Sequence, residues 1–425
     1  MREQVLYAAP GGAISDEQLR LTLEDALSDC RDRLGRVLLL VPDYTRFHSN
    51  AGRIANLVFH MLDGERCHVD LLPALGTHLP MSDEQIDAMY GADIPKDRFL
   101  VHNWRTGVVK IGQVPASFVT EVSGGQYNEA IDVEVSKYLY DGYDLILSVG
   151  QVVPHEVVGM ANHTKNIFVG CGGLSMISGT HLLGAIYGME NMMGRDFSPV
   201  RKVFDYANEH FLKDLSIWYA LTVTTAPEDE IRMHGLFIGQ DRSFFEKAVA
   251  LSLEKNMNFL DRPIRKAVVL LDGDEFKSTW IGNKATYRVC MAMADGGELI
   301  ILAPGIEMFG EDPENDAMLR KYGYCGREKI LKLHETEADL QANPSVTAHI
   351  IFGSPTGRFS ITFCPGHLGR EEVEAIGFGY IPYEEAAARY DPKVLKDGYN
   401  TMPDGEEIFY ISKPALGLWA NRDRF

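Results

Sequence analysis

The strongest constraint on the fold is a recurrent pattern in which a short apolar run is followed by a loop rich in Gly, Pro or Asp and then by an amphipathic stretch. Residues 36–41 (RVLLLV) and 67–72 (CHVDLL) are the first two runs, and residues 143–149 (YDLILSV) form a third. Runs of this length with little polar alternation are typical of strands buried on both faces of a parallel sheet. The sequence therefore predicts an α/β fold with largely parallel sheets.

The same pattern begins again after residues 261–263, so we expect a second α/β domain. Its predicted strands are residues 266–271, 298–302 and 348–352. A chain of 425 residues also exceeds what one hydrophobic core usually serves. We predict an N-terminal cofactor-binding and catalytic domain over residues 1–262, a C-terminal α/β domain over residues 263–425, and an active-site cleft between the two. The tail after about residue 408 fits packing on either domain.

The charge balance excludes some classes of partner. The chain has 41 Lys and Arg residues against 60 Asp and Glu residues, which gives a formal net charge of -19. A surface this acidic repels nucleic-acid phosphates and anionic lipids, so we expect neither nucleic acid nor a membrane as a partner. An anionic substrate must then be held by local cationic side chains. The sequence does not indicate an oligomeric state.

Cysteine usage and the N-terminus indicate a cytoplasmic protein. The six cysteines are scattered and include no C-x-x-C pair of the kind that binds zinc or exchanges disulfides. Residues 1–12 lack the basic segment and apolar core of a signal peptide. No apolar run approaches the roughly 20 residues that are needed to span a bilayer.

Polar residues follow the first two predicted strands. In Asp43-Tyr44-Thr45-Arg46, the guanidinium group can hold a carboxylate through two hydrogen bonds, and Asp43 can orient it or bind a ribose hydroxyl. The alternative is a solvated turn held by Asp43. His78 is a candidate general acid or base, because an unperturbed pKa of about 6.5 populates both protonation states. Loops at the carboxyl ends of parallel strands share one edge of the sheet, so we expect them to converge.

The densest group of chemically active residues lies between residues 155 and 181. It contains His155, His163 and His181, which are three of the 13 histidines, together with Lys165 and a glycine-rich loop. Imidazole binds several transition metals, so these histidines do not identify a metal, and their spacing matches no H-E-x-x-H pattern. A structural role, in which the glycines permit a tight turn and His181 caps a helix, stays open.

The second domain offers one further candidate. The segment Trp280-Ile281-Gly282-Asn283-Lys284 precedes an apparent helix that runs to Met293. Lys284 is placed to close over an anionic ligand from across a cleft between the domains. The alternative is a solvated surface lysine.

Taken together, these motifs resemble the lactate racemase family of nickel-pincer enzymes. The resemblance covers most of the chain and depends on the order and spacing of several short motifs. They are Asp43-x-Thr45-Arg46, Gly76-x-His78-x-Pro80, Pro154-His155, the lysine ten positions later at Lys165, the histidine sixteen positions beyond it at His181 and, more weakly, Lys284.

The resemblance implies a racemase or epimerase of 2-hydroxy acids that works by reversible hydride transfer. It implies a nickel-pincer nucleotide, which is a nicotinic-acid-derived mononucleotide with two sulfur arms, made by separate cofactor-biosynthesis enzymes. Lys165 would be its covalent tether, and His181 would be the nickel ligand from the protein. The resemblance also implies that His78 and His155 are the acid/base pair. Arg46 and Lys284 would bind the substrate carboxylate, and Asp43 and Thr45 would contact the cofactor.

The chain departs from the lactate-active members of that family near the expected substrate. It has Asn162-His163-Thr164 in place of Gly-Gly-Arg, His78-Leu79-Pro80 in place of His-Arg-Pro, and Trp280-Ile281 in place of Tyr-Gln. Leu79 and Ile281 stand where those members have Arg and Gln, so the site has fewer polar side chains to hydrogen-bond a hydrophilic substrate. Trp280 adds an apolar surface. We therefore predict a 2-hydroxy acid with an apolar or aromatic side chain. The alternative is lactate, malate or a sugar acid on the same cofactor.

Two other readings belong to different classes. A non-catalytic metal-binding or cofactor-binding protein would keep Lys165 and His181 but would not need both His78 and His155. A zinc hydrolase would use the three histidines His155, His163 and His181 and would form no lysine adduct.

Overall fold

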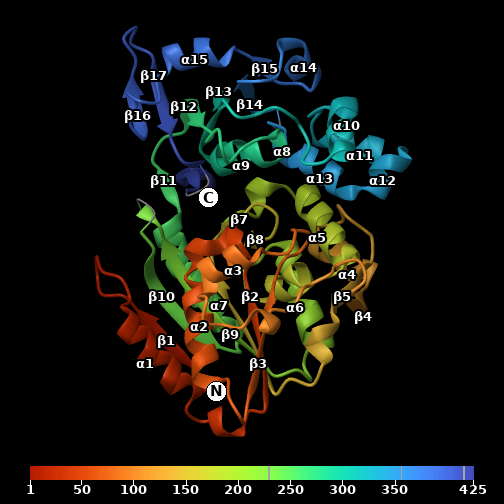
Figure 1. Ribbon diagram of the computed structural model, residues 1–425. Helices are drawn as coiled ribbons and strands as arrows, with labels where there is room; N and C mark the ends of the chain where they lie inside the picture. The colour runs from red at the N-terminus through yellow and green to blue at the C-terminus, as the bar shows by residue number, and fades with distance from the viewer. Residues whose placement is uncertain (228–229, 356, 415–416) are drawn as a thin grey trace. The chain divides into compact units, whose positions relative to one another are not determined.

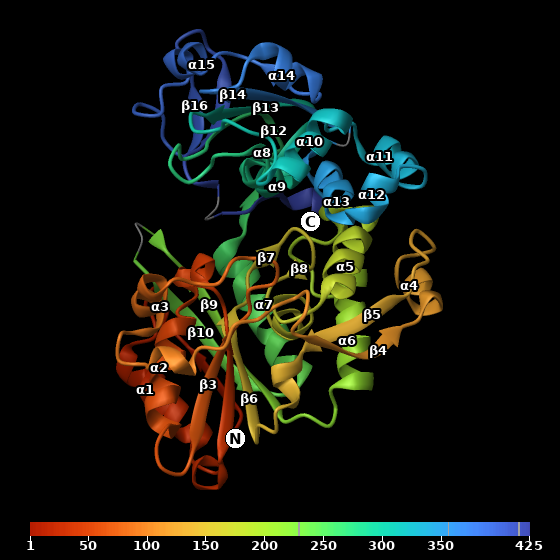
Figure 2. The same ribbon diagram turned by 45° about the vertical axis from the view of Figure 1, so that its right-hand side comes forward.

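The computed structural model describes residues 1–227, 230–355, 357–414 and 417–425 (Figures 1 and 2). The chain divides into two compact units, and each contains a six-stranded sheet of its own. Unit 1 consists of Met1–Leu183 and Asn191–Asn256, and unit 2 consists of Gly184–Glu190 and Met257–Phe425.

The sheet of unit 1 has the strand order β1-β10-β9-β6-β2-β3. Strands β9, β6, β2 and β3 are parallel, and β10 and β1 are added antiparallel at one edge. The prediction of a largely parallel sheet is therefore confirmed, and all three predicted runs are strands. The bounds are β1 (Gln4–Tyr7), β2 (Arg36–Val41), β3 (His68–Pro73), β6 (Leu145–Gln151), β9 (Ile217–Thr225) and β10 (Arg232–Gly239).

Helices cover both faces of this sheet, which explains why its strands lack polar alternation. Helices α1 (Asp16–Leu27) and α2 (Ala51–Leu62) bury alternate residues of β2, such as Val37 and Leu39, in one core. Helix α7 (Arg242–Asn256) packs on β9 and β10, on the opposite face (Figures 1 and 2). The other elements that begin in unit 1 are α3 (Asp83–Tyr90), β4 (Val108–Val114), α4 (Ala116–Val122), β5 (Ile131–Ser136), β7 (Pro154–His155), β8 (Gly159–Met160), α5 (Leu174–Tyr187) and α6 (Pro199–Phe211).

The sheet of unit 2 has the order β15-β14-β13-β12-β17-β16 and is parallel except for β16. Its strands are β12 (Ile264–Leu270), β13 (Met293–Ala303), β14 (Phe359–Pro365), β15 (Gly379–Tyr380), β16 (Gly398–Thr401) and β17 (Glu407–Ile411). Its helices are α8 (Thr279–Gly282), α9 (Lys284–Val289), α10 (Pro313–Tyr322), α11 (Arg327–His334), α12 (Ala338–Ala342), α13 (Pro344–Gly353), α14 (Arg370–Ala375) and α15 (Tyr383–Arg389). None of the helices in the described ranges is both long enough and apolar enough to cross a bilayer.

One predicted strand is wrong. Residues 348–352 lie in helix α13, and the strand of this region is β14. Every residue from Val346 to Gly353 is buried, so the helix shows no polar face in the sequence. A continuous apolar run of this length fits a buried helix as well as a buried strand. Pro344 in the first turn suits a helix start, because its missing N–H has no partner there in any case.

The C-terminal tail belongs to unit 2. Strand β17 pairs with β12 inside the sheet. Strand β18 (Trp419–Asn421) pairs in parallel with β11 (Asn258–Leu260), at the start of the same unit. The tail after residue 408 is therefore built into the second domain.

Candidate active site

The loops that follow β2 and β3 are tied to neighbouring parts of unit 1. The turn after β2 is anchored to β9 through hydrogen bonds from Thr222 Oγ1 to the Ser49 carbonyl (2.7 Å) and from Thr224 Oγ1 to the His48 carbonyl (2.8 Å). The loop after β3 meets the turn that follows Lys165, where the Gly76 N–H donates to the Gly170 carbonyl at 2.8 Å. These contacts fix three loops that are distant in sequence at one edge of the sheet.

His78 and Asp43 form a hydrogen-bonded pair that the sequence did not predict as a pair. The Nδ1–H of His78 donates to the Asp43 carboxylate, which also accepts hydrogen bonds from the backbone and the hydroxyl of Thr45. Burial alone would raise the pKa of Asp43, but these hydrogen bonds and the nearby Arg46 outweigh it, so the pKa is lowered and the carboxylate is ionised. A carboxylate at Nδ1 leaves Nε2 of His78 free to accept a proton.

The other candidates in these two loops are exposed. Arg46 is an exposed residue, and its Nη1 donates to Thr45 Oγ1 at 3.0 Å. The Leu79 side chain is 86% exposed. Thr45 holds both Asp43 and Arg46, so in this structure its hydroxyl organises the turn. Contact of these side chains with substrate or cofactor stays a prediction.

His155 lies in the β7–β8 hairpin and is partly buried. Its Nδ1 accepts a hydrogen bond from the Val157 N–H (3.1 Å) and lies 3.8 Å from a carboxylate oxygen of Glu156. Burial lowers the pKa of His155 well below its usual value, and the positive charges of Lys165 and Arg46 add to this effect. His155 is therefore neutral near pH 7, the form that accepts a proton.

Lys165 lies immediately before a π-helical turn (Asn166–Gly170), a rare backbone feature that is often found at functional sites. Burial and the charge of Arg46 lower the pKa of Lys165 to about 8. The negative charges of Glu156 and Asp43 act in the opposite direction and raise the pKa. An amine with this pKa is a much better nucleophile at neutral pH than an ordinary lysine.

His181 lies inside α5, so the alternative that it caps a helix is wrong. Its Nδ1–H donates to the Ile177 carbonyl at 2.5 Å, one helical turn earlier. This bond fixes the ring and leaves the Nε2 lone pair available to a metal. Burial lowers the pKa of His181 to about 4, so the ring is neutral and does not compete with a metal for a proton.

These residues fit the group that the family resemblance implies. A nucleophilic Lys165 suits a covalent acyl-type bond, and a neutral imidazole with a fixed ring suits nickel. The zinc hydrolase reading fits less well, because His163 packs between the rings of Tyr219 and Phe245, at centroid distances of 4.0 and 5.0 Å. Among the described residues, no three His, Cys, Asp or Glu side chains are grouped as metal ligands.

The three candidates from the second domain all lie in unit 2. Trp280 stacks on His349 with a centroid distance of 3.9 Å, and Lys284 Nζ lies 5.6 Å from the ring centroid of Phe276. Ile281 is partly buried in α8. The helix predicted here is broken into α8 and α9, with Lys284 as the first residue of α9. The roles of these residues toward a substrate stay predictions.

The sequence interpretation missed one contact and one residue of this site. Asp43 is predicted as a cofactor contact, which stays a prediction, but its hydrogen bond with His78 was not foreseen. Glu156 was given no role, although it is near both His155 and Lys165. The signal for Glu156 was its position directly after His155. The signal for Asp43 was the adjacency of β2 and β3, which places residues at their carboxyl ends together.

Substituting Asp43→Asn is expected to lower turnover by about 10- to 100-fold, because the ring of His78 loses the carboxylate that fixes its tautomer. The mass of the cofactor-loaded protein should not change, since Lys165 is untouched. Steady-state kinetics and intact-protein mass spectrometry check the two parts. Wild-type turnover in the variant would contradict the role given to the pair.

Substituting His163→Phe is expected to stabilise the protein more at pH 5 than at pH 8. His163 is 4% exposed, both ring nitrogens lack a hydrogen-bond partner in the described structure, and burial lowers its pKa well below the usual value. The unfolded chain binds a proton below about pH 6.5 and the folded chain does not, so stability is lost as the pH falls below that value.

For this one group, the loss reaches about 2 kcal/mol at pH 5, at 1.36 kcal/mol per pH unit. Denaturant melts at both pH values measure it. An equal change in the free energy of unfolding at the two pH values would count against the protonation argument. It would leave only the effect of filling the space between Tyr219 and Phe245.

Comparison with known proteins supports the family resemblance. Residues 12–194 match the family model of the lactate racemase N-terminal domain. No curated protein sequence matches the chain. Its fold is similar to that of a Thermotoga maritima protein, with a TM-score of 0.80 and 24% identity over 98% of this chain and 100% of that one.

The fold is also similar to that of the lactate racemase apoprotein from Thermoanaerobacterium thermosaccharolyticum. The TM-score is 0.72 and the identity is 17%, over 96% of this chain and 93% of that one. At these identities the two solved structures establish a shared α/β fold. The family model adds a sequence match over the segment that carries Asp43, His78, His155, Lys165 and His181. Residues 12–194 therefore match the lactate racemase N-terminal domain, the family that the sequence motifs resemble.

Proposed function

We propose that this protein is a racemase or epimerase of a 2-hydroxy acid that carries a nickel-pincer nucleotide on Lys165. The observation that supports this most is the setting of Lys165, a partly buried lysine just before a π-helical turn, whose pKa of about 8 is set by desolvation and by the charges of Arg46, Glu156 and Asp43. His181, whose free Nε2 is the proposed nickel ligand, is close enough to Lys165 for the amine to influence its pKa. Both residues belong to unit 1.

When bound, the nucleotide supplies a reversible hydride acceptor, so a carbanion next to a carboxylate is avoided. The residues of the chain manage the proton. His78, oriented by Asp43, accepts the hydroxyl proton at Nε2 from one enantiomer, and neutral His155 does so from the other. Each turnover therefore begins with one histidine neutral and the other protonated. The protonated histidine donates its proton to the substrate oxygen as the other enantiomer forms, and the two exchange protons with water between turnovers. Glu156, 3.8 Å from His155, stabilises the positive charge that forms there.

The substrate carboxylate is assigned to Arg46 and Lys284, since the net charge of -19 requires local cations. For the rest of the substrate we propose an apolar or aromatic side chain. The support is the exposed Leu79, which stands where the family pattern has Arg, and the apolar ring of Trp280, which stacks on His349. With phenyllactate, kcat/KM is expected to exceed that with lactate. A strong preference for lactate, malate or a sugar acid would overturn this part alone.

The decisive experiment compares protein produced with and without the cofactor-biosynthesis enzymes. Intact-protein and peptide mass spectrometry should show a mass increase at Lys165 only in the first sample, and metal analysis should find nickel in that sample. A first sample with neither the adduct nor nickel contradicts the proposal.

A further inference from the structure

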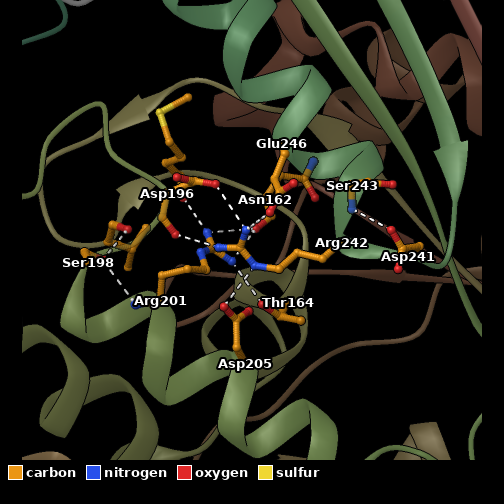
Figure 3. Close-up of polar contacts among 12 residues, drawn as sticks. Asn162, Thr164, Asp196, Ser198, Arg201, Asp205, Asp241, Arg242, Ser243 and Glu246 are labelled. Carbon is orange, nitrogen blue, oxygen red and sulfur yellow. Dashed lines mark hydrogen bonds and ion pairs between the residues drawn. The ribbon is translucent and has the colours of Figure 1, made fainter. Parts of the chain in front are cut away.

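Arg201, in the first turn of α6, is a fully buried arginine outside the proposed reaction site. Its guanidinium group donates to the Met160 carbonyl (2.6 Å), the Asn162 carbonyl (3.4 Å) and Thr164 Oγ1 (3.0 Å). Figure 3 shows these contacts with Asn162 and Thr164. All three acceptors lie in the five residues that precede Lys165. Arg201 therefore binds the segment from which the proposed tether projects.

The charge of Arg201 is not used in an ion pair within the described structure. The neighbouring carboxylates of Asp196 and Asp205 pair instead with Arg242, at 3.2 and 3.1 Å (Figure 3). Phe245 covers the Arg201 guanidinium group at 4.5 Å from its ring centroid. Burying a cation without an ionic partner is costly, so its hydrogen bonds to the loop must offset a large desolvation penalty. A simple packing role would be served by an apolar side chain.

The segment that Arg201 holds has an unfavourable backbone. Asn162 and His163 have φ angles of 68° and 56°, in the left-handed region that non-glycine residues rarely adopt. Asn162 Oδ1 accepts a hydrogen bond from the His163 N–H at 2.6 Å, and the His163 ring is held between Tyr219 and Phe245. Two consecutive residues in this conformation persist only when their surroundings hold them.

The start of α6 joins the same segment. Ser198 Oγ accepts from the Arg201 N–H (3.1 Å) and donates to the Val158 carbonyl (3.2 Å). Ser198 and the Arg201 side chain thus form hydrogen bonds with residues 158, 160, 162 and 164. Lys165 follows directly and immediately precedes the π-helical turn.

We propose that Arg201 is a positioning residue for Lys165. It holds Met160–Thr164, with Asn162 and His163 in the left-handed conformation, and so fixes the position from which the Lys165 side chain projects. The inference rests on the proposed function only in taking Lys165 as the site of cofactor attachment. The hydrogen bonds from Arg201 to residues 160–164 are present in the chain without cofactor, so their effect can be tested there.

The test uses protein made without the cofactor-biosynthesis enzymes. Arg201→Met removes the donors, and Arg242→Met is the matched control, since Arg242 belongs to the same charged cluster but makes no described hydrogen bond to residues 160–164. Peptide-resolved hydrogen exchange reports on residues 158–168. Acetylation by the N-hydroxysuccinimide ester of acetic acid, followed over pH by mass spectrometry, reports on the Lys165 amine.

In Arg201→Met, exchange in residues 158–168 should be at least about tenfold faster, and the midpoint of Lys165 acetylation should move to higher pH. Arg242→Met should leave both within about twofold of wild type, and Arg201→Lys should restore them in part because one donor group returns. An Arg201→Met protein that melts like wild type and matches Arg242→Met in both measurements overturns the proposal.

Thr164→Val covers the case in which Arg201→Met does not fold, because it removes one acceptor and keeps the side-chain shape. It should loosen the same peptide to a smaller extent, and wild-type exchange and acetylation in this variant would overturn the proposal. A second sample of each protein, made with the cofactor-biosynthesis enzymes, separates the two claims. If wild type takes up no adduct, the proposed function fails while the measurements without cofactor still decide the role of Arg201.

Discussion

Replacing Lys165 with arginine is expected to abolish both the covalent adduct and racemisation. A guanidinium group keeps the positive charge but is not a nucleophile at neutral pH, since its pKa stays above about 12. The lysine, in contrast, has a pKa of about 8, so about a tenth of it is neutral at pH 7. An ordinary lysine with a pKa near 10.5 would be neutral to less than about 0.1% at that pH. Burial therefore supplies roughly two orders of magnitude in reactive amine.

The measurement is intact-protein mass and turnover for protein made with the cofactor-biosynthesis enzymes. Lys165→Arg should show the unmodified mass and at least about a 10⁴-fold loss of turnover, because the hydride acceptor is lost altogether. Lys202→Arg, an exposed lysine on α6, is the matched control and should be modified and active like wild type. A Lys165→Arg protein that keeps the adduct places the tether elsewhere and ends the assignment.

The strands of unit 1 were predictable because helices bury both faces of the sheet, which leaves uninterrupted apolar runs in the sequence. The same signal failed at residues 348–352, since α13 is buried on all sides and so presents an equally apolar run. Length and periodicity do not separate the two cases in five residues. The fold class was predicted correctly because it depends on many apolar runs together. The assignment of one segment as helix or strand depends on a single run.

The site was predictable as a set of residues and not as a set of contacts. His78 and Asp43 are separated by 35 positions, and only the parallel pairing of β2 with β3 brings their loops together. Arg201 had no signal at all, because its partners are mainly backbone carbonyls, which every sequence contains. Burial, which sets the pKa of Lys165 and His155, is likewise a property of the folded chain.

Substituting either His78→Asn or His155→Asn is expected to lower turnover by about 10²- to 10⁴-fold, the usual contribution of a general acid or base. The adduct at Lys165 and the nickel content should stay at the wild-type level, because neither histidine is assigned to the cofactor. The double variant should lose less than the product of the two single losses, since the pair acts as a unit in one proton transfer sequence. Peptide mass, metal content and turnover for both enantiomers test this.

The equilibrium between the two enantiomers constrains how kcat/KM can change in these variants. For a racemase the equilibrium constant between enantiomers is one, so kcat/KM must fall by the same factor in both directions, whichever histidine is replaced. The matched control is His60→Asn, an exposed histidine whose Nε2 lies 2.6 Å from Asp93 and which should have no effect on turnover. For an epimerase, whose substrate has a second stereocentre, the ratio of kcat/KM in the two directions stays at the wild-type equilibrium constant.

Variants that keep nickel, the adduct and full turnover would show that the two histidines are not the acid/base pair. Wild-type protein that carries both and turns over none of the 2-hydroxy acids would instead favour a cofactor carrier without catalysis.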